Sequence, residues 1–410
     1  MKVLVSHPTS NQNNRAVLKG LKDHGILYKF YTAIAVFSGD TLDKLKNIGP
    51  LKELSRRHFD SSLQTITKRV PLKEVMRLIS SKLGIKAFVK HETGIFSIDA
   101  VYQDMDKKVA TSLKKHAKHH LDAVYAYEDG AYHSFKAAKN YNIACLYDLP
   151  IGYWRYARQL LATEQALWPD WASTLTGFKD SEQKLQRKDA ELALADNIFV
   201  ASTFTAKSLS AYPGKLAPVH VIPYGFPEPV TNRIYNLNNR PIKLLFVGGL
   251  SQRKGIANMF AAVEPLIPHV ALTVVGHKST NDCEALNNAL SKHNWIPSLS
   301  HAEVLKQMQA HDVLLFPSLF EGFGLVITEA MSQGTPVITT DRTAGPDLIE
   351  HDVNGWLVEA GSTKALQACI ETLIDKPEKI IAAGKAALET AKKRPWSVYG
   401  KELAEALLKP

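Results

Sequence analysis

FPSLFEGFGLVITEAMSQGTPVITT, residues 316–340, is the stretch that decides the fold predicted for this sequence. The apolar run at residues 312–316 is typical of a buried parallel strand. A tight loop with two glycines, EGFG, follows it, and residues 325–333 are good helix formers that end at a Gly-x-Pro break. A second apolar strand starts there. The order strand, loop, helix, strand is the repeating unit of a doubly wound α/β sheet.

The loop in this unit predicts a ligand site at the end of the strand. Free backbone N–H groups and the positive end of the helix dipole favour a phosphate or diphosphate there. Glu321 precedes the loop, at its rim, and Glu329 lies about a turn and a half along the helix. The two carboxylates therefore predict separate hydrogen-bond acceptors for two parts of one ligand, such as sugar hydroxyls. The predicted diphosphate-binding residues are Gly322, Phe323, Gly324 and Leu325.

A second loop carries two cations. A buried strand ends at Gly248 and Gly249, and Arg253 and Lys254 follow before the next helix. Two cations at a strand end, opposite the Glu321 loop, can neutralise a diphosphate leaving group. We therefore expect both loops to contact one activated ligand.

These motifs resemble those of a known family. The Glu-x7-Glu pattern with Gly-Phe-Gly between, about 70 residues after GGLSQRKG, is similar to the donor-site signature of retaining GT-B glycosyltransferases, in particular glycosyltransferase family 4. The resemblance implies that Glu321 contacts the transferred sugar, that the glycine loop holds the diphosphate, and that Glu329 binds the ribose. Lys254 matches the family's lysine. Gly249 stands where the family commonly has arginine, and Arg253 can supply that charge.

The resemblance also implies the domain organisation of an α/β chain. At 410 residues the chain is long enough for two domains. We expect two Rossmann-like domains that face each other across a cleft, with a C-terminal helix that crosses back to the N-terminal domain. The predicted parts are an acceptor-binding domain at residues 1–225, a linker at 226–240, a nucleotide-sugar-binding domain at 241–392, and the returning helix at 393–410.

Polar residues at strand ends of the first domain predict an acceptor site. His7 and Asn11 follow the first strand and precede a helix expected over residues 16–24, and Glu128 and Asp129 follow a later strand. Ligands of open α/β sheets bind at such strand ends. The alternatives are loop capping by His7 and Asn11, and capping of a helix N-terminus by Asp129.

Positive charge is concentrated in the first third of the chain. Residues 1–120 hold 22 Lys and Arg against 10 Asp and Glu, whereas the whole chain has a net charge of +10. This favours an acidic partner. Residues 66–90 predict a basic amphipathic helix, which is typical of binding to an anionic membrane. The alternative is a helix packed on its own domain with a solvated basic face. We expect no nucleic-acid partner, because no basic motif is interleaved with aromatic residues.

Several patterns bear on location and metals. The sequence has no run of eighteen apolar residues, turns polar after five residues and has three scattered cysteines, so we expect a cytoplasmic protein, at most peripheral on the inner face of a membrane. The triplet DMD, residues 104–106, is interpreted as the acidic first turn of a helix rather than a metal–nucleotide motif. His116, His119 and His120 are interpreted as a solvated helix face. No metal or cofactor is expected.

The patterns together predict a metal-independent retaining glycosyltransferase. It would move a sugar from a nucleotide-diphosphate sugar to a hydroxyl of a glycan or lipid-linked glycan, in bacterial-type surface polysaccharide or glycolipid assembly. The alternatives are a nucleotide-sugar epimerase, a glycan phosphorylase, or a non-catalytic nucleotide- or glycan-binding subunit. From the sequence, Glu321→Ala is expected to abolish transfer and to leave the melting temperature near that of the wild type.

Overall fold

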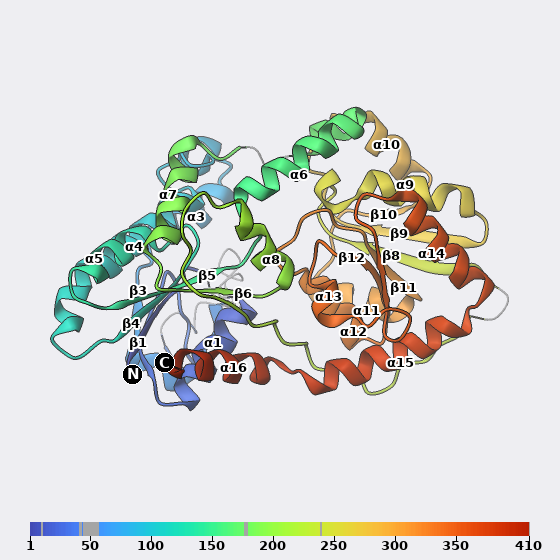
Figure 1. Ribbon diagram of the computed structural model, residues 1–410. Coiled ribbons are helices and arrows are strands. Elements are labelled where there is room, and N and C mark those ends of the chain that lie inside the picture. Colours follow the sequence, from blue (N-terminus) through green and yellow to red (C-terminus); the bar gives the residue numbers. More distant parts are fainter. Residues whose placement is uncertain (10, 41–42, 44–56, 176–178, 238–239, 410) are drawn as a thin grey trace.

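Two α/β lobes lie side by side in the computed structural model, each built on its own sheet (Figure 1). The structure describes residues 1–409 except residues 10, 41–42, 44–56, 176–178 and 238–239. Both sheets are parallel throughout, and helices cover their faces. This arrangement is the GT-B fold that the sequence predicts.

The N-terminal sheet has seven strands in the order β3-β2-β1-β4-β5-β6-β7. The side chains of β1 and β4 are entirely buried, as expected for parallel strands covered on both faces. The strand order reverses between β1 and β4, which opens a crevice at their carboxyl ends. The strands are β1 (Val3–Ser6), β2 (Leu27–Thr32), β3 (Thr67–Arg69), β4 (Ala123–Tyr127), β5 (Ala144–Leu149), β6 (Asn197–Val200) and β7 (Val219–Val221).

Helices pack on both faces of this sheet. Val3 and Val5 join the core beneath α1 and α16, whereas Leu4 joins the core beneath α4 and α5. The α-helices are α1 (Gln12–Asp23), α3 (Leu72–Lys82), α4 (Ile98–Ala117), α5 (Tyr132–Lys139), α6 (Trp154–Leu167), α7 (Glu182–Leu194) and α8 (Thr203–Ser208). The 3-10 helices are η2 (Ser61–Ile66), η3 (Lys86–Val89), η4 (Pro169–Thr174) and η5 (Leu209–Ala211).

The first helix begins earlier than the sequence predicts. Asn11 caps α1 by accepting a hydrogen bond from the backbone N–H of Asn14 at 3.1 Å, so the helix starts at Gln12 rather than at residue 16. Asn13 and Asn14 are buried in its first turn. The polar sequence of this turn had indicated a loop.

The C-terminal sheet repeats the same order with six strands, β10-β9-β8-β11-β12-β13. The strands are β8 (Ile242–Val247), β9 (Val270–Val275), β10 (Asn294–Ile296), β11 (Val313–Phe316), β12 (Val337–Thr340) and β13 (Trp356–Val358). The helices are η6 (Gln252–Lys254), α9 (Ile256–Val263), η7 (Glu264–Leu266), α10 (Glu284–Ser291), α11 (His301–Ala310), α12 (Leu325–Ser332), α13 (Gly345–Leu348), α14 (Thr363–Asp375), α15 (Glu378–Lys393) and α16 (Trp396–Leu408). The unit β11–loop–α12–β12 confirms the strand, loop, helix and strand predicted for residues 316–340.

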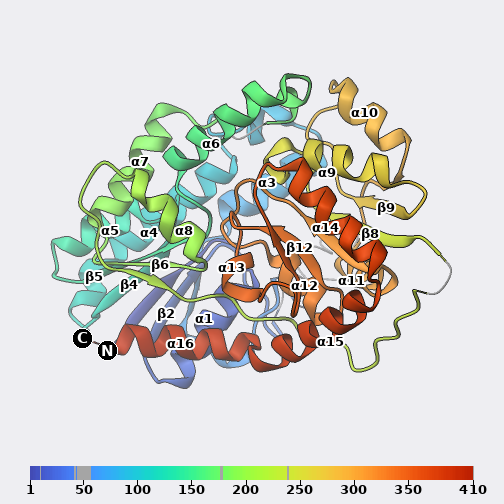
Figure 2. The same ribbon diagram turned by 45° about the vertical axis from the view of Figure 1, so that its right-hand side comes forward.

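The last helix returns to the first lobe, as predicted. α15 and α16 run along one side of the molecule, and α16 ends beside the N-terminus (Figures 1 and 2). α16 packs on α1, where a Cβ atom on Gly20 would lie 2.0 Å from the carbonyl oxygen of Gly400. Glycines on both helices therefore allow their backbones to touch.

A second crossing lies at the opposite end of the lobes. α6 spans from the first lobe to the second (Figures 1 and 2), and η4 at its end packs into the C-terminal core. The ring of Trp171 stacks on Phe260 with centroids 5.9 Å apart. The backbone N–H of Gln252 donates to Thr174 Oγ1 at 2.9 Å. Part of residues 1–225 therefore packs with the second lobe.

Two sequence interpretations in α4 are wrong. Asp104 and Asp106 lie in the middle of α4 rather than in its first turn, and the buried carboxylate of Asp106 accepts hydrogen bonds from the backbone N–H groups of His133 and Ser134, at 2.6 and 2.9 Å. Asp106 thus caps α5 from a neighbouring helix. His116 is buried against the rings of Tyr28 and Tyr31, whereas His119 and His120 are exposed, as predicted, but in the turn after the helix.

Among the described residues, no helix combines the length and the apolar character needed to cross a bilayer.

Candidate functional site

The two loops singled out in the sequence meet at the point where the C-terminal strand order reverses. β8 leads into Gly248 and η6, and β11 leads into the Glu321 loop. The backbone N–H of Leu319 donates to the carbonyl oxygen of Arg253 at 2.9 Å, and Ser318 Oγ donates to the same oxygen at 3.2 Å. These bonds fix the cation-bearing loop against the carboxylate-bearing loop.

Gly255 allows this close approach. Its φ is +68°, and a Cβ atom there would lie 2.1 Å from the carbonyl oxygen of Pro317. An L-residue would be strained by the left-handed backbone and would also collide with the neighbouring loop.

We predict that Gly255→Ala lowers the free energy of unfolding by at least about 1–2 kcal/mol, the cost of the left-handed conformation alone. Urea unfolding followed by circular dichroism measures the change. Gly249→Ala is the matched control for stability, because a Cβ at Gly249 meets no atom within 4 Å. Equal unfolding free energies for the two variants would contradict this account of Gly255.

Glu321 is the centre of a buried charge cluster. Its Oε1 accepts hydrogen bonds from Arg253 Nη1 at 2.7 Å, from Ser318 Oγ at 3.1 Å and from Lys254 Nζ. The residue is 8% exposed, so it lies inside the site rather than at its rim. The structure thus brings together the predicted carboxylate and both predicted cations.

Burial and neighbouring charges shift the pKa values of Glu321 and Lys254 in opposite directions. Burial raises the pKa of Glu321, but Lys254 and Arg253 more than offset it and leave that pKa below its ordinary value. The pKa of Lys254 is lowered, chiefly by burial, while Glu321 opposes this change. The ion pair therefore favours the charged forms of Glu321 and Lys254, against the neutral forms that burial favours.

A cavity of about 390 Å³ lies beside this cluster and collects residues from both lobes. The C-terminal lobe contributes Gly248, Lys254, Glu321, Gly322, Phe323, Gly324, Leu325 and Glu329, among others. The N-terminal lobe contributes Asn11, Asn13, Pro150, Ile151 and Tyr224. We call this space the donor cavity, after the donor site that the sequence predicts here. Gly249 and His7 do not line it.

The helix N-terminus at the donor cavity is set by Gly324. This residue has a φ of +88°, and a Cβ there would lie 2.7 Å from the ring of Phe316. Glycine therefore permits the turn that starts α12 at Leu325. The first-turn amides of α12 lie at the cavity wall and are suited to bind an anionic group.

Glu329 has a partner that sequence reasoning missed. Its Oε1 lies 3.0 Å from Nε2 of His301, the first residue of α11. The capping box of Ser300 and Glu303 fixes that helix start. This capping box is the sequence signal that places His301 at a helix terminus.

The N-terminal lobe contacts the Glu321 loop at Gly322. The carbonyl oxygen of Gly322 accepts hydrogen bonds from Thr205 Oγ1, at 2.8 Å, and from Ser202 Oγ. A Cβ at Gly322 would lie 2.0 Å from the carbonyl oxygen of Pro150. Sequence reasoning missed these two hydroxyls, whose only local signal is that Ser202 caps α8.

A second cavity of about 230 Å³ adjoins the donor cavity, and Ile151 lines both. We call it the acceptor-side cavity. Its polar and aromatic lining consists of Glu128, Trp154, Arg158, Asp180, Lys188, Arg253 and Phe320. The guanidinium of Arg158 lies 5.2 Å from the ring centroid of Trp154. The space therefore offers charges of both signs and an aromatic ring.

The buried carboxylate of Glu128 lies in this second cavity. Burial raises the pKa of Glu128, and Lys188, whose Nζ is 3.3 Å from Glu128 Oε2, acts against that rise. Burial lowers the pKa of Lys188, but Glu128, Asp129 and Asp180 more than offset it, so the pKa of Lys188 is raised. The lysine is therefore a permanent cation at this wall.

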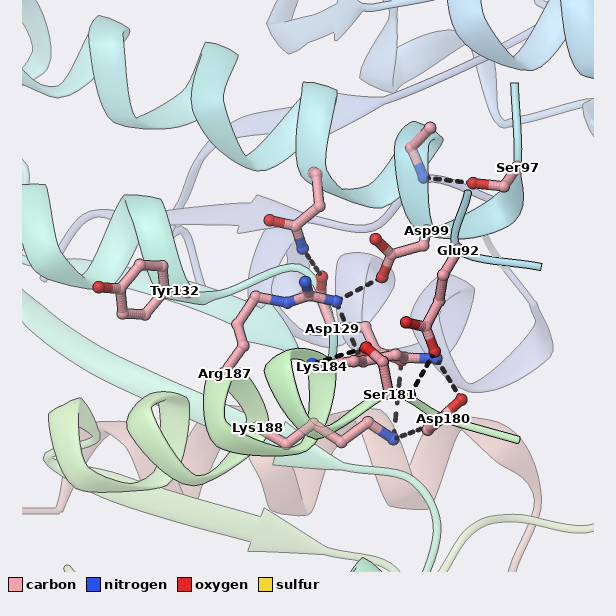
Figure 3. A network of polar contacts seen from close by, with 12 residues as sticks. Glu92, Ser97, Asp99, Asp129, Tyr132, Asp180, Ser181, Lys184, Arg187 and Lys188 are labelled. Atoms are coloured by element: carbon pink, nitrogen blue, oxygen red, sulfur yellow. Dashed lines mark hydrogen bonds and ion pairs between the residues drawn. The ribbon is translucent and has the colours of Figure 1, made fainter. Parts of the chain in front are cut away.

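Asp129 belongs to a polar network around α7 rather than to a helix cap. It adopts a left-handed φ of 71° and lies 3.6 to 3.8 Å from the cations of Lys184, Arg187 and Lys188, which point toward it from α7 (Figure 3). The N-terminal amides of α5 are instead bonded by Glu191 and Asp106. The capping alternative for Asp129 is therefore wrong.

His7 and Asn11 take different positions. The buried ring of His7 packs edge-on against Tyr127, with centroids 4.5 Å apart, and burial, followed by the charge of Arg57, lowers its pKa to about 3. His7 is therefore neutral. His7 Nδ1 accepts a hydrogen bond from the backbone N–H of Thr9 at 3.2 Å, which confirms loop capping for His7. Asn11 caps the helix α1 rather than a loop, and it also lines the donor cavity.

In the described ranges, one cluster of His91, Glu92 and Asp180 brings possible metal-ligating atoms within 4.8 Å of one another. Its carboxylates have other partners. Lys184 Nζ lies 3.0 Å from Asp180 Oδ1, and the backbone N–H of Ser181 donates to Glu92 at 2.9 Å (Figure 3). This geometry is that of an ion-paired network.

Comparison with known proteins agrees with the geometry. The sequence model of the family described as glycosyl transferases group 1 matches residues 228–390. The capsular polysaccharide biosynthesis glycosyltransferase CapM from Staphylococcus aureus is 26% identical over 220 residues, which cover 49% of this chain and 58% of CapM. The chain spans less than two thirds of the length of the curated relatives it matches.

Solved structures match over the whole chain. Sucrose-phosphate synthase from Thermosynechococcus elongatus superposes with a TM-score of 0.68 at 18% identity, covering 100% of this chain and 98% of that one. HepE from Anabaena, in complex with UDP, gives a TM-score of 0.62 at 18% identity and covers 100% of both chains. The chain therefore has the GT-B fold over its full length, and residues 228–390 of its C-terminal lobe match the glycosyl transferases group 1.

Proposed function

We propose that this protein is a retaining glycosyltransferase of family 4 type that takes a nucleotide-diphosphate sugar as donor. The observation that carries the proposal is the donor cavity, where Lys254, Glu321, Glu329 and the N-terminus of α12 converge. A diphosphate suits the cations and the helix amides, and two carboxylates suit the hydroxyls of a sugar and a ribose. HepE, of the same fold, binds UDP in its solved complex.

The acceptor would enter from the N-terminal lobe. The acceptor-side cavity adjoins the donor cavity at Ile151 and presents Glu128, Trp154 and Arg158 to an incoming molecule. An aromatic ring beside hydrogen-bonding charges is suited to a sugar. We place the reaction in the assembly of a surface polysaccharide or glycolipid, which is consistent with the likeness to CapM.

The proposed transfer needs no metal or cofactor. The acceptor oxygen forms a bond to the anomeric carbon on the face from which the diphosphate leaves. The bond between that carbon and the phosphate oxygen breaks, and the acceptor proton passes to the leaving oxygen. Lys254 and Arg253 stabilise the charge that develops on the diphosphate. Glu321, held between these cations, accepts hydrogen bonds from the sugar.

Nucleotide binding tests the donor site. We predict that one of UDP, GDP or ADP raises the melting temperature, and that Lys254→Met weakens binding of this nucleotide by about 10- to 100-fold, the value of a charged hydrogen bond. Isothermal titration measures the affinity. Lys243→Met, which removes an exposed cation on β8, is the control and leaves affinity unchanged. Equal affinity of the Lys254 variant and the wild type would contradict the assignment.

The products separate the proposal from its alternatives. A retaining transferase releases nucleoside diphosphate and forms a glycoside with the anomeric configuration of the donor, which NMR identifies. Consumption of free phosphate would indicate a phosphorylase, and an epimerised donor without acceptor would indicate an epimerase. Nucleotide binding without turnover on any acceptor would indicate a binding subunit.

A further inference from the structure

Helix α3 buries the polar residues Glu74 and Ser80 and exposes several of its apolar side chains. Glu74 is 1% exposed and lies within 2.9 Å of both Arg57 and Arg77. Leu72, at 71%, and Ile79, at 44%, are exposed on the outer side, together with Val75. A surface helix in water normally does the reverse. The helix does pack on its own domain, through Glu74 and Leu78, but its exposed apolar side chains differ from the alternative in which the apolar face is packed.

The exposed apolar surface continues beyond the helix. In the described part of the chain, eight of nineteen exposed large apolar side chains lie between residues 72 and 98. Lys73 Nζ donates to the carbonyl oxygen of Ile95 at 3.0 Å, and the rings of Phe88 and Phe96 meet with centroids 5.8 Å apart. These contacts hold the segments together. The eight side chains are Leu72, Val75, Ile79, Leu83, Ile85, Phe88, Ile95 and Ile98, which we call the apolar face.

Charge is segregated around the apolar face. Lys82, Lys86 and Lys90 are exposed on it or beside it. The carboxylates of the same segment point inward: Glu92 accepts from the backbone N–H of Ser181, and Asp99 pairs with Arg187 (Figure 3). The outward surface therefore combines apolar groups with cations.

We propose that the apolar face docks this protein on an anionic lipid bilayer. Apolar side chains that protrude beside lysines match the two layers of such a surface, because the lysines meet lipid phosphates while the apolar groups enter the acyl boundary. Docking would remove large apolar groups from water. It would also place the positive charge of the first third of the chain against an anionic surface.

The docked face is joined to the acceptor-side cavity. The network of Figure 3 connects the segment of Glu92 and Asp99 to α7, whose Lys188 lines that cavity. If the proposed transferase function holds, the acceptor is a glycan carried on a membrane lipid, presented to the cleft from the side of the bilayer. The docking itself does not depend on that function.

Vesicle flotation of the full chain tests the docking. We expect the wild type to float with phosphatidylcholine vesicles that contain about one third phosphatidylglycerol, and far less with pure phosphatidylcholine or at high salt. The triple variant Leu72→Gln/Ile79→Gln/Leu83→Gln should lower the partition coefficient at least about tenfold. Lys86→Gln/Lys90→Gln should lower it by roughly fivefold per lysine.

Matched controls come from the rest of the chain. Ile234→Gln removes an apolar side chain that is 85% exposed, and Lys364→Gln/Lys376→Gln removes two exposed cations of the second lobe. Both should float like the wild type. Because the substituted side chains are exposed, every variant should keep the wild-type melting temperature.

Three results would overturn the proposal. The first is a wild type that floats with neither vesicle, and the second is triple and lysine variants that float as the wild type does. The third is a dimer in light scattering that the triple variant abolishes, without flotation, which would assign the apolar face to a second copy of the chain. Nucleotide affinity is measured in parallel without lipid, so a failure of docking is distinct from a failure of the donor site.

Discussion

Glu321→Gln is expected to lower the rate of transfer at least about a hundredfold, the scale for removing one preorganised contact to the reacting group. The carboxylate lies between Arg253 and Lys254, and Glu321 and Lys254 both line the donor cavity, where the proposed sugar and diphosphate would bind. The amide keeps the shape of the side chain and removes its charge. Steady-state turnover with the donor identified by nucleotide screening measures the effect.

The same variant should also lose stability, which the sequence alone does not predict. With Glu321 neutral, Arg253 and Lys254 remain partly buried without their anion, a change expected to cost about 3 kcal/mol. A nucleoside diphosphate supplies negative charge to the same cations, so it should raise the melting temperature of the variant more than that of the wild type.

The control for this pair of effects is Glu359→Gln, which removes an exposed carboxylate of the same lobe. It should change neither turnover nor melting temperature. Wild-type turnover by Glu321→Gln would remove the assignment of this residue. An unchanged melting temperature, without nucleotide, would show that the charge cluster contributes nothing to folding.

Gly322→Ala is expected to abolish transfer while both lobes stay folded. The new Cβ would lie 2.0 Å from the carbonyl oxygen of Pro150, an atom of the opposite lobe. Backbone atoms cannot yield as a flexible side chain does, so the lobes must stay apart. Separated lobes cannot bring acceptor and donor into reacting distance, and a displacement of about 1 Å already costs on the order of a hundredfold.

Two measurements distinguish this steric effect from misfolding. Small-angle scattering should give a larger radius of gyration for Gly322→Ala than for the wild type, at an unchanged circular dichroism spectrum. Thr205→Val, which removes a hydrogen bond to the carbonyl oxygen of Gly322, should weaken closure in the same direction, whereas Ser210→Ala, on the exposed side nearby, should not. Wild-type turnover with an unchanged radius would contradict the role of Gly322 as a contact between the lobes.

The elements of the donor site were predictable because their signals are local. The strand, loop and helix around Glu321 follow from an apolar run, two glycines and a Gly-x-Pro break, and all of these act within a few residues. The meeting of Lys254 with Glu321 follows from the rule that ligands bind where the strand order reverses. What the sequence did not reveal is how deeply Glu321 is buried, because burial depends on how both lobes pack around the loop.

Non-local packing explains the other differences. The capping of α5 by Asp106 and Glu191 comes from two other helices, so no pattern near residue 131 indicates it. The helical spacing of apolar residues in α3 predicts two faces but does not say which one points outward. Trp171 belongs to a stretch without periodicity, and its place in the core of the opposite lobe follows only from the path of α6.

The paths of α6 and of α15–α16 constrain how the two halves of the molecule can move. One crossing lies at each end of the gap between the halves, and each is anchored by buried contacts, Trp171 at one end and Gly20 with Gly400 at the other. Two fixed points define a line, so a rigid half retains a single rotation, a rocking about the line that joins them. A hinge motion about the α15–α16 end alone would pull Trp171 out of its packing against Phe260. Any opening between the halves is therefore expected to follow this rocking.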